Sequence, residues 1–77
     1  MTFQVNNTYA IKYIGDSQME DHATVIKRTK CFATVVTKGG ETHRAKIRTS
    51  IYDDGEFLLP YGDYSMAPVM RANRQIN

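Results

Sequence analysis

The chain has 77 residues, with ten Lys or Arg against eight Asp or Glu and a formal net charge of +2. A chain of this length forms one domain with a small core, which excludes a large buried active site. The single cysteine excludes an internal disulfide framework, and no apolar run is long enough to span a membrane. The first residues lack the pattern of a secretory signal, so we expect a cytoplasmic protein with no membrane partner.

The chain order predicts strands separated by turns. Strands are expected where β-branched and aromatic residues gather, over residues 8–14, 23–27, 32–37, 42–49 and 56–59. A tight turn is expected at Asn6-Asn7, because Asn tolerates a positive φ. The polar residues 15–21 predict a loop. Gly39-Gly40, between two strand-like runs, predicts a two-residue hairpin turn.

The C-terminal third predicts turns and a weak last strand. Asp53-Asp54-Gly55 favours a turn, and Pro60 ends the pairing of the strand before it because proline has no N–H to donate. Residues 64–70 could form an edge strand, and residues 71–77 predict a frayed polar tail. No stretch has a helical period. The fold class expected for residues 1–77 is a single all-β domain, a small antiparallel sheet or barrel of five to six short strands.

The charges are segregated along the chain. Residues 22–50 carry seven basic residues and one acidic residue, whereas residues 51–63 carry four acidic residues and no basic one. Such asymmetry can reflect a partner with a strong field, such as nucleic acid or an acidic protein face. Two simpler explanations stay open: basic and acidic strands that neutralise each other across the sheet, or a solvated cationic surface.

The alternation over residues 42–49 predicts a strand with two different faces. Ala45 and Ile47 would share one face, and the basic residues between and beside them would lie about 6.5–7 Å apart on the other. This spacing suits successive phosphates of a partly extended nucleic-acid strand. The residues expected to contact nucleic acid or a partner are Lys27, Arg28, Lys30, Arg44, Lys46 and Arg48. Those expected to stack on bases or touch a protein are Tyr52, Tyr61, Tyr64 and Met66.

Residue types that carry catalysis are not found in a recognisable arrangement. Asp53 and Asp54 are explained by turn formation, and no serine, histidine and aspartate can be given triad roles. His22, Cys31 and His43 are three scattered ligands where a structural zinc site needs four. We therefore expect no enzyme, no metal and no cofactor.

Several motifs resemble those of small β-rich proteins from phages, plasmids and bacterial mobile elements. They are Phe3–Tyr9, Val25–Thr29 with its Lys-Arg-Thr, Arg44–Ile47, Gly55–Phe57 and Tyr61–Pro68 with its Tyr-Ser-Met-Ala-Pro. The chain departs from that group at Asn6-Asn7, where the group carries Gly-Asp. The resemblance implies a mobile-element origin, a setting in which small proteins bind nucleic acid or block a host defence complex.

Three functions follow as expectations. The first is a non-enzymatic binding protein whose basic hairpin contacts the backbone of DNA or RNA. The alternative is a phage-encoded inhibitor, of the anti-CRISPR or anti-restriction type, that binds a host nucleic-acid-processing protein. The third is a homodimer formed by pairing of the edge strand over residues 64–70 with its copy.

Overall fold

The computed structural model describes residues 2–49 and 55–76 and confirms the all-β fold class, since no helix occurs among these residues. Its strands are β1 (Thr8–Tyr13), β2 (Asp16–Arg28), β3 (Phe32–Thr37), β4 (Thr42–Lys46), β5 (Arg48–Thr49), β6 (Glu56–Leu58) and β7 (Val69–Gln75). The expected number of five to six is too low. The predicted strand over residues 42–49 is interrupted at Ile47 and counts as two, β4 and β5.

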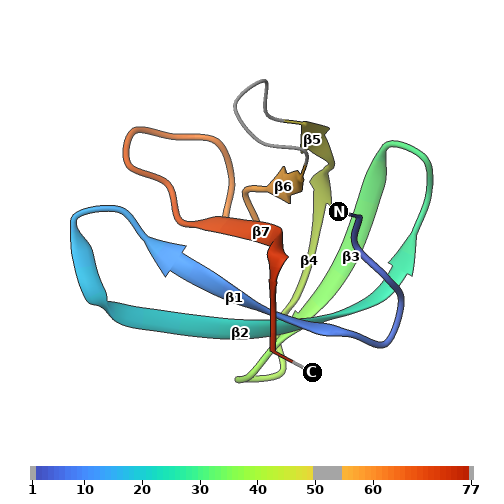
Figure 1. Cartoon of the computed structure of the whole chain (residues 1–77), viewed down its shortest axis with the longest axis horizontal. Coiled ribbons are helices and arrows are strands. Elements are labelled where there is room, and N and C mark those ends of the chain that lie inside the picture. Colours follow the sequence, from blue (N-terminus) through green and yellow to red (C-terminus); the bar gives the residue numbers. More distant parts are fainter. Residues whose placement is uncertain (1, 50–54, 77) are drawn as a thin grey trace.

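All seven strands form one antiparallel sheet, in the order β4-β3-β2-β1-β7-β6-β5. Because β4 and β5 are consecutive pieces of chain, the two ends of this order are joined, and the sheet curls nearly into a barrel (Figure 1). At the break between them, the Ile47 amide donates to the Cys31 carbonyl over 2.7 Å. Curling of this kind leaves little free edge for unwanted pairing with other chains.

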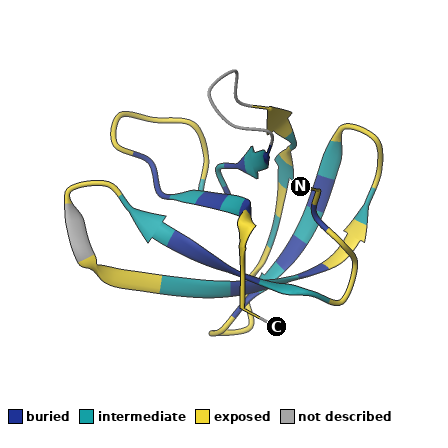
Figure 2. Ribbon diagram, viewed as in Figure 1, coloured by how far each residue is buried: buried dark blue, intermediate teal, exposed yellow. Residues whose placement is uncertain are grey.

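The core lies inside the curl (Figure 2). Alternate residues of β3 point inward, and so do Ala23 and Val25 of β2, which follows from the two-residue period of a strand. The fully buried large side chains are Phe3, Tyr9, Ile11, Val25, Val35, Leu58 and Met70. Phe3 comes from the segment before β1 and meets Tyr9 edge to face, with 4.9 Å between ring centroids. The N-terminal segment therefore closes one end of the curled sheet.

Two predicted turns are present. Asn6 has a φ of 75°, which confirms the tight turn at Asn6-Asn7. The β3–β4 hairpin also turns where Gly39-Gly40 predicts, but its loop has three residues instead of two. The Gly40 amide donates to the Thr37 carbonyl over 2.9 Å, which closes the turn, and Gly40 itself has a φ of 87°. This is a turn closed by a glycine bulge, a common three-residue hairpin loop.

The loop predicted over residues 15–21 is wrong, because β2 already begins at Asp16 and is thirteen residues long. Its first part pairs with β1, for example Lys12 opposite Glu20, and these two side chains form an ion pair. The hairpin extends beyond the core, so residues 18–20 are exposed on the sheet and show no alternation of apolar and polar side chains. Without that alternation, a strand resembles a polar loop in the sequence.

The C-terminal prediction is also wrong. Residues 63–66 form a bend and turn, and the last strand is β7, which starts only at Val69. The frayed tail predicted over residues 71–77 is instead strand as far as Gln75, with Ala72 fully buried. β7 lies between β1 and β6 in the sheet, and β6 pairs with its first part at Met70 and Arg71, so β7 is not an edge strand of the sheet. Of the predicted Asp53-Asp54-Gly55 turn, the two aspartates lie outside the described residues.

Candidate functional site

Strand β4 presents its basic residues to solvent, as the alternation predicts. Arg44 and Lys46 are exposed, whereas Ala45 is half-buried and packs against the core. The register aligns these residues with the outer side of β3, because Arg44 lies opposite Thr34 and Lys46 lies opposite Phe32. One outer surface of the sheet therefore combines two cations, a hydroxyl and an aromatic ring.

A β-bulge in β2 adds a third cation to this surface. The register between β2 and β3 shifts between Val25 and Lys27, so that Lys27 lies opposite Thr34 and Arg28 lies opposite the buried Ala33. A bulge inserts one residue and reverses the faces of the residues after it. Lys27 thus joins the outer row, and Arg28 turns toward the interior.

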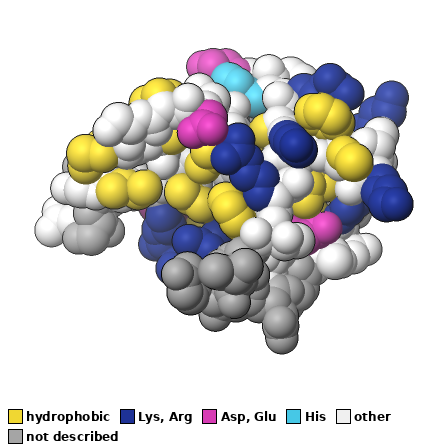
Figure 3. Space-filling view, turned by 90° about the horizontal axis from the view of Figure 1, so that it is seen from above, with side chains coloured by type: hydrophobic (Ala, Val, Ile, Leu, Met, Phe, Trp, Pro, Cys, Tyr) yellow, Lys and Arg dark blue, Asp and Glu magenta, His cyan; other side chains and the backbone are white. Residues whose placement is uncertain are grey.

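We call Lys27, Arg44 and Lys46, together with Phe32 and Thr34, the cationic face. None of the ion pairs between described side chains involves these three cations. Lys30 lies in the exposed β2–β3 turn next to this face. Seen from above, Lys and Arg side chains extend from the centre to the right side of the molecule, with hydrophobic side chains among them, and others lie at the lower left (Figure 3).

The Arg44 guanidinium lies over the Phe32 ring, with its Cζ atom 4.1 Å from the ring centroid. This is cation–π geometry, which holds the long Arg44 side chain against the sheet. A shallow pocket of about 160 Å³ opens beside the pair and is lined by Lys27, Arg28, Thr29, Phe32, Thr34 and Arg44. The cationic face is therefore hollowed where its aromatic ring lies.

Arg28 is engaged by groups of the same chain. Its guanidinium donates to both carboxylate oxygens of Glu56, at 2.8 and 3.2 Å, and to the Phe3 carbonyl at 2.9 Å. Glu56 also accepts from the Phe3 amide at 2.9 Å. Burial opposes the ionisation of Glu56, but the bonds from Arg28 and Phe3 outweigh it and hold the Glu56 pKa below its usual value. Arg28 and Glu56 thus fasten the N-terminal segment, and the prediction that Arg28 belongs to the contact surface is not supported by this placement.

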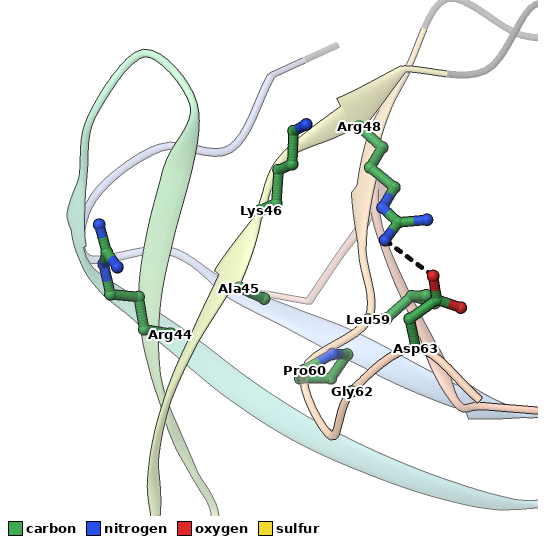
Figure 4. A pocket seen from close by; sticks show the side chains of 8 residues that line it. All are labelled: Arg44, Ala45, Lys46, Arg48, Leu59, Pro60, Gly62 and Asp63. Atoms are coloured by element: carbon green, nitrogen blue, oxygen red, sulfur yellow. Dashed lines mark hydrogen bonds and ion pairs between the residues drawn. The ribbon is translucent and has the colours of Figure 1, made fainter.

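Arg48 is also engaged. Its guanidinium lies 3.1 Å from Asp63, in the loop after β6, and the two close one side of a second pocket of about 160 Å³ (Figure 4). In this view Arg44 extends away from Arg48, although both line the pocket. Because both Arg48 and Asp63 are exposed, Arg48 stays within reach of solvent, but the carboxylate partly offsets the positive charge that it presents to a ligand.

The expected aromatic and methionine contacts are dispersed. Tyr61 is half-buried and donates its hydroxyl to Asp21 at 3.0 Å, so it belongs to the interior. Tyr64 and Met66 are exposed in the β6–β7 loop, on different elements from the cationic face. Tyr52 lies outside the described residues. None of the described members of this set stands beside Arg44 and Lys46 as a stacking platform.

Sequence reasoning missed Phe32 and Thr34. Both lie in a strand that was predicted correctly, and the period of two places them on its outer side once Ala33 and Val35 are assigned to the core. The available signal was the pairing across the Gly39-Gly40 hairpin, which brings Phe32 opposite Lys46. Phe is among the residue types most often buried, so the residue type alone does not mark Phe32 as an outer residue.

No group of three His, Cys, Asp or Glu side chains in residues 2–49 and 55–76 is arranged to hold a metal ion. Within the same ranges there is no helix long and apolar enough to cross a membrane. No protein family, curated protein or solved structure matches this chain.

Proposed function

We propose that the protein is a non-enzymatic nucleic-acid-binding module that contacts the phosphate backbone through its cationic face. The observation that supports this most is the alignment of Lys27, Thr34 and Arg44 across three neighbouring strands, with Lys46 on the same side. The three cations have no carboxylate partner among the described side chains. Cations left unneutralised on a rigid sheet are the footprint expected of phosphate contacts.

Three other basic residues of the same chain give a contrast, because Lys12, Arg28 and Arg48 each pair with a carboxylate. Among the described side chains, Lys27, Arg44 and Lys46 form no ion pair, and they are neighbours on one outer surface, where they can act on one ligand together.

Salt dependence of binding tests the proposal. A labelled single-stranded oligonucleotide of mixed sequence, followed by fluorescence anisotropy, should bind with a slope of log K against log salt of about −2, if three phosphates are contacted. Binding should then weaken about 20-fold between 50 and 200 mM salt. The double reversal Arg44→Glu/Lys46→Glu should weaken it by more than tenfold.

A matched control separates this surface from net charge. Lys38→Glu/Arg74→Glu makes the same change in net charge at two exposed positions, in the β3–β4 loop and in β7. It should keep most of the binding, because neither residue lies on the cationic face. Equal loss in both double variants, or binding that salt does not weaken, would overturn the proposal.

A second candidate, the binding of a host protein, is favoured by one observation. Ile14, Tyr64 and Met66 are each more than half exposed, in the β1–β2 turn and the β6–β7 loop. Met66 has a φ of 61°, a strained value for a bulky residue, and its Cε atom lies close to Gly15. Strain and exposure together in an apolar residue are typical of a contact site.

The two candidates are separated by affinity capture at high salt after nuclease treatment. If the second candidate holds, a host protein remains bound to the chain and to the Arg44→Glu/Lys46→Glu variant but is lost with Tyr64→Ser/Met66→Ser. If it fails, nothing survives nuclease and salt, or the same proteins are captured by all variants.

A further inference from the structure

The cationic face carries an aromatic ring that phosphate binding alone does not require. Phe32 is half-buried on the outer side of β3, directly opposite Lys46, and Arg44 lies over it. If the face bound only phosphates, a polar side chain at this outer position would serve as well as a phenyl ring. The ring and the guanidinium are both planar groups, and nucleobases stack on planar side chains of these two kinds.

We infer that the ligand is single-stranded and that one unpaired base stacks on the Phe32–Arg44 pair; this inference rests on the proposed function. The pocket beside the pair has a volume of about 160 Å³, more than ten times the roughly 10–15 Å³ that a single water needs. A base in a duplex is stacked on its neighbours and cannot reach a protein ring, whereas a base in a single strand can.

Cations lie where the phosphates before and after such a stacked nucleotide would pass. Lys27 lines the same pocket, and Lys46 lies opposite Phe32 on β4, so cations flank the ring in two directions. Neighbouring strands are about 4.8 Å apart, which places the backbones of β2 and β4 about 10 Å from each other across β3. Backbone phosphates before and after a stacked base can therefore each meet a cation.

The polar side chains that line this pocket besides the cations are the hydroxyls of Thr29 and Thr34. Neither offers the paired donor and acceptor of an Asn or Gln amide, the side chains that read a base edge specifically. The site should therefore accept different bases, as stacking platforms generally do.

Fluorescence anisotropy at fixed salt, with four labelled probes of one length, tests the inference. They are a mixed-sequence single-stranded DNA, the RNA of the same sequence, the DNA duplex, and a single strand with abasic sites in place of its central nucleosides. We expect the DNA or the RNA single strand to bind about five- to 100-fold more tightly than the abasic strand, the range that stacking of one base provides. The duplex should also bind more weakly than the intact single strand.

Two variants locate the effect. Phe32→Leu keeps an apolar side chain but removes the ring, and Arg44→Lys keeps the charge but removes the planar guanidinium. Both should bring the intact single strand down to the affinity of the abasic strand, with the salt slope changed by less than one. Circular dichroism at matched temperature checks that each variant is folded, and the comparison of probes with the unmodified protein does not depend on either variant.

The outcomes separate this inference from the proposed function. Salt-dependent binding that is equal for single-stranded, abasic and duplex probes overturns the inference and leaves phosphate binding in place. Binding to none of the four probes at 50 mM salt overturns both. A preference for the intact single strand that persists in Phe32→Leu and Arg44→Lys places the stacking elsewhere and overturns the assignment to this pair.

Discussion

Lys27 and Arg28 are adjacent and carry the same charge, yet the structure places them in opposite environments. Lys27 is exposed on the cationic face, and Arg28 is directed inward to Glu56. The cause is the β-bulge, which reverses the face of the residues that follow it. A count of charges along the sequence treats the two residues alike, so it overstates the positive charge available to a ligand. The difference can be measured as a difference in stability.

We predict that Arg28→Ala destabilises the fold by about 2–3 kcal/mol, because it leaves the Glu56 carboxylate half-buried and the Phe3 carbonyl without its donor. The whole stability of a chain this size is about 4–12 kcal/mol, so the loss is substantial. Replacing both partners, as Arg28→Met/Glu56→Leu, should cost less than Arg28→Ala alone. Urea unfolding of the three variants measures these values.

Lys27→Ala is the matched control, and it should change stability by about 0.5 kcal/mol at most while it weakens nucleic-acid binding. A different result would revise the assignment of the two residues. If Arg28→Ala kept full stability and lost binding, Arg28 would belong to the contact surface and not to the clamp around Phe3.

At the scale of elements, the strands and turns that depend on neighbouring residues could be predicted from the sequence. The β3 strand, the β3–β4 hairpin and the turn at Asn6 follow from alternation and from glycine or asparagine at positive φ. The outer position of Arg44 and Lys46 follows in the same way. The polar half of β2 could not be predicted, because it pairs with β1 beyond the core and shows no apolar alternation. Strand β7 could not be predicted, because it is paired with β1, which lies far away in the sequence. The inward turn of Arg28 depends on a bulge that no sequence pattern marks.

The β3–β4 hairpin gives a controlled test of turn chemistry. Gly39 and Gly40 are adjacent, and an added Cβ would meet no atom within 4 Å at either position, so crowding plays no part. Only Gly40 has a positive φ, 87°. Gly40→Ala should therefore cost about 1–2 kcal/mol, the penalty for a side chain in the left-handed region.

Gly39→Ala should be neutral or stabilising by up to about 1 kcal/mol, because it only restricts the unfolded chain. Thermal unfolding followed by circular dichroism compares the two variants. Equal losses would mean that the loop rearranges around either alanine, which would argue against the three-residue loop with its bulge at Gly40.

At the scale of the whole molecule, the curled sheet is closed by polar clusters as well as by its core. Near Phe3, Arg28 and Glu56 hold the N-terminal segment. A second cluster links β1, β2 and the loop after β6, because Asp21 accepts hydrogen bonds from Tyr13 at 2.5 Å and from Tyr61 at 3.0 Å. Both clusters depend on ionised carboxylates, so the free energy of unfolding of the curled sheet depends on whether those carboxylates are protonated.

The hydrogen bonds from Tyr13 and Tyr61 hold the Asp21 pKa below its usual value of 3.8, and the Glu56 pKa is likewise below 4.5. In both cases the unfolded chain binds the proton more readily, so the stability they contribute is present above about pH 4.5 and is lost as the pH falls through the lower, folded values. The pKa values of the two tyrosine hydroxyls are shifted in the opposite direction, upward. The hydrogen bond to Asp21 raises the pKa of Tyr13, and burial together with Asp21 raises that of Tyr61.

Stability should therefore be flat from about pH 5 to pH 9, fall in acid, and fall again above about pH 10, where tyrosines of the unfolded chain lose their protons first. Asp21→Asn should lower stability at pH 7 by about 1–2 kcal/mol, because a neutral amide acceptor replaces the charged carboxylate that accepts from both tyrosines. It should also flatten both limbs, since Asp21 contributes to the shifts of both tyrosines. Urea unfolding from pH 2 to pH 11 measures the profile. An Asp21→Asn variant with both limbs unchanged would show that the cluster does not couple protonation to folding.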